Sequence, residues 1–465
     1  ERPVVECLAE DITLACARLP RAERPKACLY VSLAPRQAAS QSLEQVVFLD
    51  LLLLCLVDLS TELVYMAEMA ELHSEVLDFQ GSALVLRVSG FSDKIYTLVR
   101  DLLRPVLGEH NGDLESAGLW TDERVARCAE LLRERYANND LTSTQLVRLL
   151  LSAASVGTRY MSTEKISVVQ TLISDSSVTL ASRLTQWQQG LQVRCLAYGD
   201  VQAAEVRALL AEEVAQPLGK RSVGGSGQAG AEAAVSLAPL LQMHVPPERT
   251  VRLLLARPRS AKERNAAVLC SFGLGAYAPE AALALYLLEL LAAEPFFDEL
   301  RTKQQLGYEV SCRTDELQRQ LSLGLKVVSS KASAAELLRR ILRFVATDLP
   351  ALLQGAAQKG ELRGKYLAAL QQSLEQPALT LREAAGRYWV RMLDSSLAFD
   401  RRDAEKALAR RWLRDEAEGG LSEQQLLRML QELVQKALLS EPRLTIAVAS
   451  VEDEEVFLNA LKREV

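Results

Sequence analysis

Histidine is scarce in this sequence, which has only three among its 465 residues: His73, His110 and His244. A zinc-peptidase helix needs two histidines four positions apart, so that both imidazoles face one ion. Met69 and Leu77 stand at those offsets from His73, and the other two histidines lie in stretches rich in Asn, Gly or Pro. We therefore expect that this chain by itself binds no metal.

Three further features are missing, and each excludes a class of protein. The net charge is −6 and Lys and Arg are scattered among acids, so the chain lacks the basic patch of a nucleic-acid-binding protein. The longest apolar run, residues 46–57, is interrupted by Asp50 and is too short to span a bilayer. None of the eight cysteines forms a C-x-x-C pair, which favours buried free thiols and a reducing compartment. We expect a cytoplasmic protein, with no membrane contact, whose natural N-terminus is missing from this sequence, which starts at Glu1.

Independent hydrolase chemistry also lacks a motif. The nearest approach to a nucleophile elbow is the glycine-rich stretch at residues 224–227, but no strand is expected before it. The same stretch is not followed by G-K-[ST], so it is not a phosphate loop.

The sequence is long enough for two domains, and one stretch of biased composition divides it. Residues 219–230 read GKRSVGGSGQAG, a composition typical of a flexible linker. We place a linker or exposed loop at residues 221–236, between a domain at 1–220 and a domain at 237–465. The alternative is a loop inside one domain.

The same order of elements is expected twice along the chain. A long helix is followed by two strands, an amphipathic helix, a helical region and a last strand. In the first copy these elements are expected, in this order, at residues 43–72, 74–80, 83–90, 93–107, 114–189 and 191–198. In the second copy they are expected at residues 279–303, 308–313, 321–328, 332–347, 359–438 and 444–448. An internal duplication of roughly 230 residues explains this order. The predicted fold class is α+β, with two homologous domains that are each a mainly antiparallel sheet backed by helices.

Residues 295–310 read PFFDELRTKQQLGYEV and have a purely structural explanation. Arg301 and Lys303 lie in the last turn of the long helix, where positive charge complements the helix dipole. Gly307 ends the helix, and a strand is expected from Tyr308. On this interpretation Arg301 is a solvated charge and Tyr308 a strand aromatic.

The nine residues from Leu300 to Tyr308, LRTKQQLGY, resemble a signature of the C-terminal half of the insulin-degrading enzyme, nardilysin and pitrilysin family. Gln304 departs from the pattern, since several members carry Glu there. Further segments, among them Pro25 to Leu29 and Phe399 to Arg401, also resemble family landmarks, in the family's order along almost the whole chain.

The resemblance implies that this chain is similar to the third and fourth domains of a four-domain zinc metallopeptidase, one half of a clamshell. The zinc would lie in the missing N-terminal half, which would be this chain's partner, and peptides would be its substrates. The resemblance assigns transition-state hydrogen bonding to Arg301 and Tyr308, and substrate binding to these two with Gly307, Glu309 and Val310.

Taken alone, the chain is expected to be inactive, and a homodimer is possible. The alternative is a binding or scaffold subunit of a two-chain complex, without a share in catalysis.

Overall fold

The computed structural model describes residues 2–19, 25–108, 121–138, 141–174, 180–219, 235–241, 243, 251–256, 262–438 and 443–448. The predicted linker at 221–236 lies outside these residues except for its last two positions, as do His110, His244 and the helix expected at 454–461. Chain contacts define two compact units. The first comprises residues 1–139, 156–243 and 378–399, and the second comprises residues 140–155, 244–377 and 400–465.

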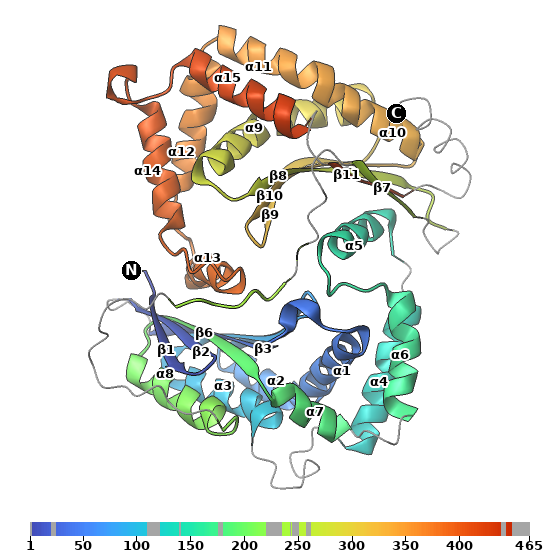
Figure 1. Ribbon diagram of the computed structural model, residues 1–465, viewed down its shortest axis with the longest axis vertical. Coiled ribbons are helices and arrows are strands. Elements are labelled where there is room, and N and C mark those ends of the chain that lie inside the picture. The colour runs from blue at the N-terminus through green and yellow to red at the C-terminus, as the bar shows by residue number, and fades with distance from the viewer. Residues whose placement is uncertain are drawn as a thin grey trace. The chain divides into compact units, whose positions relative to one another are not determined.

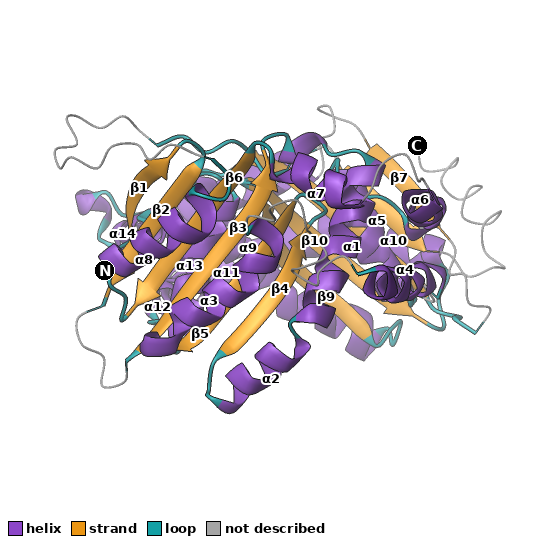
Figure 2. Cartoon of the chain, turned by 90° about the horizontal axis from the view of Figure 1, so that it is seen from below, coloured by secondary structure: helices purple, strands orange, loops and turns teal. Residues whose placement is uncertain are grey.

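The first unit is built on a sheet whose described strands run in the order β1-β2-β6-β3-β5-β4. Figure 2 shows these strands side by side. All neighbours are antiparallel except β2 and β6, which are parallel. The strands are β1 (Val4–Ala9), β2 (Ile12–Arg18), β3 (Lys26–Pro35), β4 (His73–Phe79), β5 (Ala83–Phe91) and β6 (Leu191–Gly199).

Helices from the first part of the chain cover one face of this sheet. Ala27, Leu29, Val31 and Leu33 of β3 alternate with residues of the other face, and all four join the core packed under these helices. The helices of the unit are α1 (Leu43–Leu59), α2 (Thr61–Met69), α3 (Ser92–Leu107), α4 (Asp122–Ala137), α6 (Ser162–Ser174), α7 (Leu180–Gln188) and α8 (Ala203–Leu210), with short turns η1 (Ala38–Ser40) and η2 (Ala211–Ala215).

The second unit has a sheet with the described strand order β7-β11-β8-β10-β9. Its neighbours are antiparallel except β7 and β11, which are parallel. The strands are β7 (Val251–Ala256), β8 (Ala266–Ala276), β9 (Glu309–Leu317), β10 (Gln320–Ser329) and β11 (Arg443–Val448).

Helices from the second part of the chain cover one face of this sheet. Alternate residues of β8, from Ala266 to Phe272, join the core beneath them. The helical elements are α9 (Pro279–Phe297), η3 (Asp298–Lys303), α10 (Ala334–Arg343), η4 (Phe344–Asp348), α11 (Leu349–Gln358), η5 (Leu362–Leu367), α12 (Ala368–Glu375), α14 (Arg401–Leu413), η6 (Glu416–Glu418), α15 (Glu423–Leu433) and η7 (Val434–Leu438).

The two sheets share one topology, which confirms the predicted α+β fold with two related sheets backed by helices. Strands β2, β6, β3, β5 and β4 correspond in order and direction to β7, β11, β8, β10 and β9. Strands β1 and β2 were not predicted from the sequence: Glu6 interrupts the apolar pattern of β1, and Glu10 and Asp11 form the turn before the short strand β2. Two expected helices are also broken: residues 43–72 form α1 and α2, and residues 359–395 are interrupted before α13 (Leu381–Leu393).

Each sheet has a second face, and a helix from the other part of the chain covers it. Helix α5 (Ser143–Ser155) belongs to the second unit and packs on β8 and β11, although it precedes the predicted linker in sequence. Helix α13 belongs to the first unit and packs on β3 and β6 (Figure 1). The contiguous ranges 1–220 and 237–465 therefore differ from these units in the segments 140–155, 237–243 and 378–399.

Aromatic contacts join α13 to the first sheet. The ring centroids of Tyr30 and Trp389 are 5.8 Å apart in an edge-to-face arrangement, and those of Tyr198 and Tyr388 are 5.4 Å apart. Such pairs stabilise packing beyond the area they bury. The helix is thus attached through large side chains on both of the strands that it covers.

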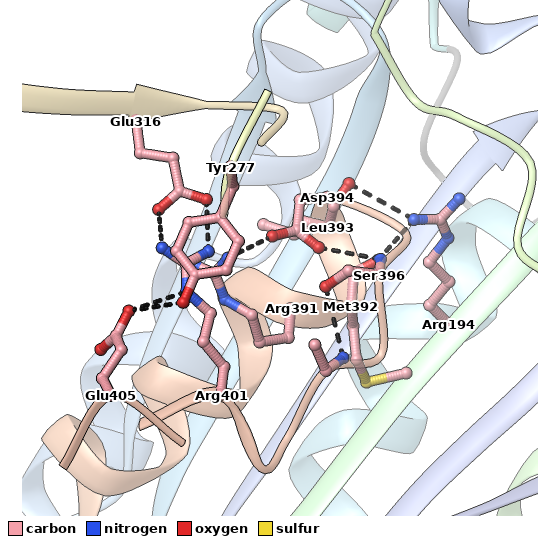
Figure 3. Close-up of polar contacts among 11 residues, drawn as sticks. Arg194, Tyr277, Glu316, Arg391, Met392, Leu393, Asp394, Ser396, Arg401 and Glu405 are labelled. Atoms are coloured by element: carbon pink, nitrogen blue, oxygen red, sulfur yellow. Dashed lines mark hydrogen bonds and ion pairs between the residues drawn. The ribbon is translucent and has the colours of Figure 1, made fainter. Parts of the chain in front are cut away.

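A buried arginine fixes the end of α13. Arg194 of β6 is 1% exposed, and its guanidinium donates to the Met392 carbonyl (Figure 3). It also donates to Ser395 Oγ at 3.1 Å and to the Ala238 carbonyl. Burial lowers the pKa of Arg194 to about 10, against the favourable charge of Asp394. A charged group at this depth is tolerated because carbonyl oxygens replace its water.

A second arginine ties α14 to the far end of β9. Arg401 donates to both carboxylate oxygens of Glu316 at 2.6 Å and to Glu405 at 3.1 Å. Its guanidinium lies 3.2 Å from the ring centroid of Tyr277 (Figure 3). This bidentate pair restrains the C-terminal end of β9.

Two serines expected to cap helices have other partners. Helix α3 starts at Ser92 itself, whose hydroxyl donates to the Pro25 carbonyl and to Asp200. Helix α10 is capped by Ser333, whose side chain accepts from the Glu336 amide. The sequence favoured Ser329 or Ser330 as this cap, but Ser329 is the last residue of β10 and donates to the Leu306 carbonyl instead.

The run at residues 46–57 forms most of α1, which is largely buried, as expected. In the part of the chain that the structure describes, no helix is long and apolar enough to cross a membrane.

A carboxylate at the turn between β4 and β5 is held in an unfavourable environment. Asp78 Oδ1 accepts from the Gly81 amide at 2.7 Å, and Asp78 lies 3.7 Å from Arg159. Burial and the charge of Asp50 outweigh Arg159 and Lys165, and they raise the pKa of Asp78 to about 6. Asp50 itself is paired with Lys165 at 2.8 Å and accepts from Tyr136.

We predict that Arg194→Met lowers the free energy of unfolding by about 3 kcal/mol, because it leaves buried carbonyl oxygens without donors. Urea unfolding measures the change. The control is Arg207→Met: Arg207 pairs with Glu6 at the surface, and its loss should cost less than about 1 kcal/mol. Equal effects of the two substitutions would contradict the role of Arg194.

We predict that Asp78 makes stability fall as the pH rises from about 4 to about 6. In this window the unfolded carboxyl, with an ordinary pKa near ~3.9, has lost its proton while the native one keeps it. The difference amounts to about 3 kcal/mol for a shift of about two pKa units. Urea unfolding between pH 4 and 7 should show this slope in the chain and a flatter one in Asp78→Asn. Parallel pH profiles would refute the assignment.

Candidate functional site

The LRTKQQLGY segment forms the junction between the long helix of the second unit and the edge strand of its sheet. Helix α9 continues into the wider turns of η3, and β9 starts at Glu309, one residue later than the sequence indicated. The junction is held closely: the Gln304 amide donates to the Glu299 carbonyl at 3.1 Å, and the Leu306 amide donates to the Leu300 carbonyl at 3.0 Å.

Two polar side chains of the segment stabilise the helix end. Lys303 lies 3.2 Å from both Asp298 and Glu299. Gln304 Nε2 donates to Glu299 Oε1 at 2.8 Å. These contacts account for Lys303 and Gln304 as structural residues.

Gly307 lies where a side chain would not fit. A Cβ at this position would be 2.0 Å from the Val328 carbonyl oxygen of β10. The Ser329 hydroxyl also fixes the residue before Gly307, because it donates to the Leu306 carbonyl. The same hydroxyl accepts from the amides of Lys331 and Ala332. Gly307 is therefore needed for close approach between the junction and β10.

Arg301 and Tyr308, the two residues to which a catalytic role was assigned, are exposed on either side of this fixed junction. Tyr308 is 56% exposed, and its hydroxyl lies 3.5 Å from Asn265 Nδ2. The Arg301 guanidinium lies 4.9 Å from the Phe297 ring centroid, and among the described residues no carboxylate pairs with it. Both side chains can therefore donate hydrogen bonds to a molecule outside the fold.

The phenol of Tyr308 is kept protonated. Partial burial and the nearby carboxylates of Glu263 and Glu309 raise its pKa above the ordinary value for tyrosine. A protonated phenol is a hydrogen-bond donor at neutral pH.

The other predicted substrate-binding residues have side chains committed inside the unit. Glu309 pairs with Lys326 and accepts from Thr144 Oγ1 at 2.6 Å. Burial opposes its charge, but these hydrogen bonds outweigh burial and lower the pKa of Glu309. Val310 is buried in the core below the sheet. Glu309 and Val310 can thus meet a substrate only through their backbone groups.

Strand β9 is the last strand in the described sheet order, so its outer edge is open. The Thr314 amide is already used, because it donates to Glu289 Oε2 of α9 at 2.8 Å. The open part of the edge is therefore the N-terminal part, next to Tyr308. An edge of this kind can pair with an extended peptide.

The residues around Tyr308 could not be predicted from the sequence. Glu263 and Asn265 precede β8, so only the folded sheet brings them near the phenol, and Lys326 of β10 pairs with the neighbouring Glu309. Nothing in their local sequence marks them.

The described residues do not form a site that fits a metal. They contain no group of three or more His, Cys, Asp and Glu side chains that could hold an ion. His73 is an exposed residue at the start of β4, without a second histidine at ligand spacing.

Two family models match parts of the chain. The middle or third domain of peptidase M16 matches residues 23–168, and domain 4 of the C-terminal lobe of PQQ synthase PqqF-like proteins matches residues 287–389. A nardilysin-like protein of Arabidopsis thaliana is 24% identical over 376 residues, which is 78% of this chain and 33% of that protein. Together these matches support a fragment of a pitrilysin-family M16 peptidase.

Solved structures show the same M16 fold. Pitrilysin matches with a TM-score of 0.73 and 18% identity over 98% of this chain and 44% of its own. A structure described as an inactive M16 peptidase domain from Pseudomonas fluorescens has a TM-score of 0.63 and 14% identity, over 97% of this chain and 98% of that one. A Helicobacter pylori protease also gives 0.63, with 12% identity over 97% of this chain and all of that one.

The chain spans a third of the length of the nardilysin-like relative and less than half of pitrilysin. It thus corresponds to part of the longer M16 proteins.

We predict that Gly307→Ala displaces the M16 signature segment. The added methyl group cannot avoid the Val328 carbonyl without a backbone shift, and overpacking of this kind costs about 1–3 kcal/mol. Thermal unfolding measures the loss. Gly355→Ala is the control, because a Cβ there meets no atom within 4 Å. A Gly307→Ala protein as stable as this control would show that the junction tolerates a side chain.

Proposed function

We propose that this chain is the half of an M16 metalloendopeptidase that does not hold the zinc. Its partner would be the N-terminal half of the same enzyme, which carries the metal, and its substrates would be peptides enclosed between the halves. In this proposal the two related parts of the chain correspond to the family's third and fourth domains, joined near residues 221–236. Alone, the chain would cleave no peptide. A cytoplasmic location stays a prediction.

One observation carries the proposal. In the segment from Leu300 to Tyr308, Lys303, Gln304 and Gly307 each have a structural role, whereas Arg301 and Tyr308 extend two hydrogen-bond donors away from a rigid junction. A surface without function has no need of a protonated phenol held beside an open strand edge.

The chemistry of the two donors suits peptide hydrolysis. Attack on a peptide carbonyl moves negative charge to its oxygen, and a fixed donor stabilises that charge more strongly than it stabilises the ground state. The phenol of Tyr308 supplies one hydrogen bond, and the guanidinium of Arg301 supplies several N–H groups in one plane. The zinc of the partner half would polarise the same bond.

The substrate backbone has a place beside these donors. The open edge of β9 at Val310 offers amide and carbonyl groups to an extended peptide. Recognition through backbone groups would make the enzyme tolerant of peptide sequence.

A second function is a binding subunit without a share in catalysis. It is favoured by the Pseudomonas fluorescens structure, which this chain matches over 98% of that structure's length. That structure is described as an inactive domain.

We predict that Tyr308→Phe lowers kcat about 10²- to 10³-fold with little change in KM, since the lost hydrogen bond strengthens in the transition state. The assay follows cleavage of a quenched fluorescent peptide by this chain combined with the zinc-binding half. The control is Tyr65→Phe, because Tyr65 is also exposed, at 65%, and lies on α2 of the first unit. If the two variants turn over equally, Tyr308 takes no part in the reaction and the binding subunit is the better assignment.

A further inference from the structure

Helix α5 starts with two hydroxyl groups that its own N-terminus does not use. Thr142 and Gln145 form a reciprocal cap: the Thr142 amide donates to Gln145 Oε1 at 2.9 Å, and the Gln145 amide donates to Thr142 Oγ1 at 3.3 Å. Ser143 and Thr144 come next in the sequence. Because Thr142 already provides the cap, their side chains are available for bonds outside the helix.

These two hydroxyls bond to the two segments that flank Tyr308. Ser143 Oγ donates to the Asn265 carbonyl at 2.6 Å, and Asn265 immediately precedes β8. Thr144 Oγ1 donates to Glu309 Oε2 at 2.6 Å, and Glu309 is the first residue of β9 and the neighbour of Tyr308. The first turn of α5 therefore bonds both to the residue before β8 and to the first residue of β9.

We propose that Ser143 and Thr144 are positioning residues for Tyr308. This inference rests on the proposed role of Tyr308 and adds the residues that place its hydroxyl. Ser143 fixes the backbone of Asn265, whose side chain meets the phenol, and Thr144 fixes the carboxylate beside it. The placement of Tyr308 in the second unit thus depends on α5, a helix that precedes the predicted linker in sequence.

Burial of these contacts restricts the groups that they join to one arrangement. Ser143 is 1% exposed, so water does not replace its hydrogen bond. Glu309 is held by Lys326, itself nearly buried, and Arg148 of α5 lies 3.8 Å from the same carboxylate. Thr144 selects one orientation of a carboxylate that is already confined.

The position of α5 does not depend on the two hydroxyls. Leu146 and Val147 are buried where α5 packs on β8 and β11, and Val147 is fully inaccessible. The free energy of this apolar contact remains when a hydroxyl is removed. Variants at Ser143 and Thr144 should therefore fold and still change the placement of Tyr308.

The test is a double-mutant cycle in the complete enzyme, formed by this chain and its zinc-binding half, with the same fluorescent peptide. Thr144→Val and Ser143→Ala should each lower kcat about tenfold or more with little change in KM, because small displacements of a reacting group are costly. Thr144→Ser, which keeps the hydroxyl, should restore turnover. The matched control is Thr171→Val, whose hydroxyl bonds only within α6 of the first unit.

The cycle separates positioning from general damage. In a Tyr308→Phe background, Thr144→Val should have no further effect, because its influence passes through the phenol. Two results would overturn the positioning role. One is that Thr144→Val lowers kcat by the same factor with Tyr308 and with Phe at position 308. The other is that Thr144→Val leaves kcat unchanged although Tyr308→Phe lowers it. Full activity of Tyr308→Phe alone would instead remove the proposed function. Should Thr144→Val fail to fold, Ser143→Ala gives the same cycle.

Discussion

Each sheet has two apolar faces to cover, and the helices that follow its strands cover only one of them. The other face is covered by a helix taken from the other part of the chain, α5 for the second sheet and α13 for the first. A sheet face left in water would expose side chains such as Ile446 and Leu269, which are buried in this arrangement. This exchange is the constraint on which the remaining structure depends, because it joins two related units into one interdependent chain.

The candidate site is a consequence of that constraint. Tyr308 lies at an exposed junction, but the junction is fixed from several directions: by Gly307 against β10, by Ser329, and by α5 through Glu309. Rigidity around an exposed donor is what transition-state stabilisation requires, since a mobile group would lose entropy on each turnover. The far end of β9 is restrained as well, by the pairing of Arg401 with Glu316.

Much of the fold could be predicted from the sequence, and the reasons are local. The apolar periodicity of residues 279–303 and 321–328 indicated α9 and β10, and the repeated order of elements indicated two related sheets. The strands β1 and β2 were missed because charged residues lie within β1 and in the turn before β2, and the serine caps were misplaced because Ser92 and Ser329 bond to residues distant in sequence.

The exchange of α5 and α13 has no local signal, because an amphipathic helix does not specify which sheet it will cover. The same holds for Asn265 and Glu263 near Tyr308, and for Lys326, which pairs with Glu309. The signature segment predicted Arg301 and Tyr308 as candidate site residues, but their surroundings are determined by tertiary contacts alone.

The exchange also sets an order of events during synthesis on the ribosome. The first sheet is complete once β6 has emerged, yet Tyr30 and Tyr198 then wait for α13, which is translated only after most of the second repeat. During that interval the nascent chain carries an uncovered aromatic surface. Its final burial, together with the hydrogen bonds of Arg194, would mark the step at which the whole polypeptide commits to its native state.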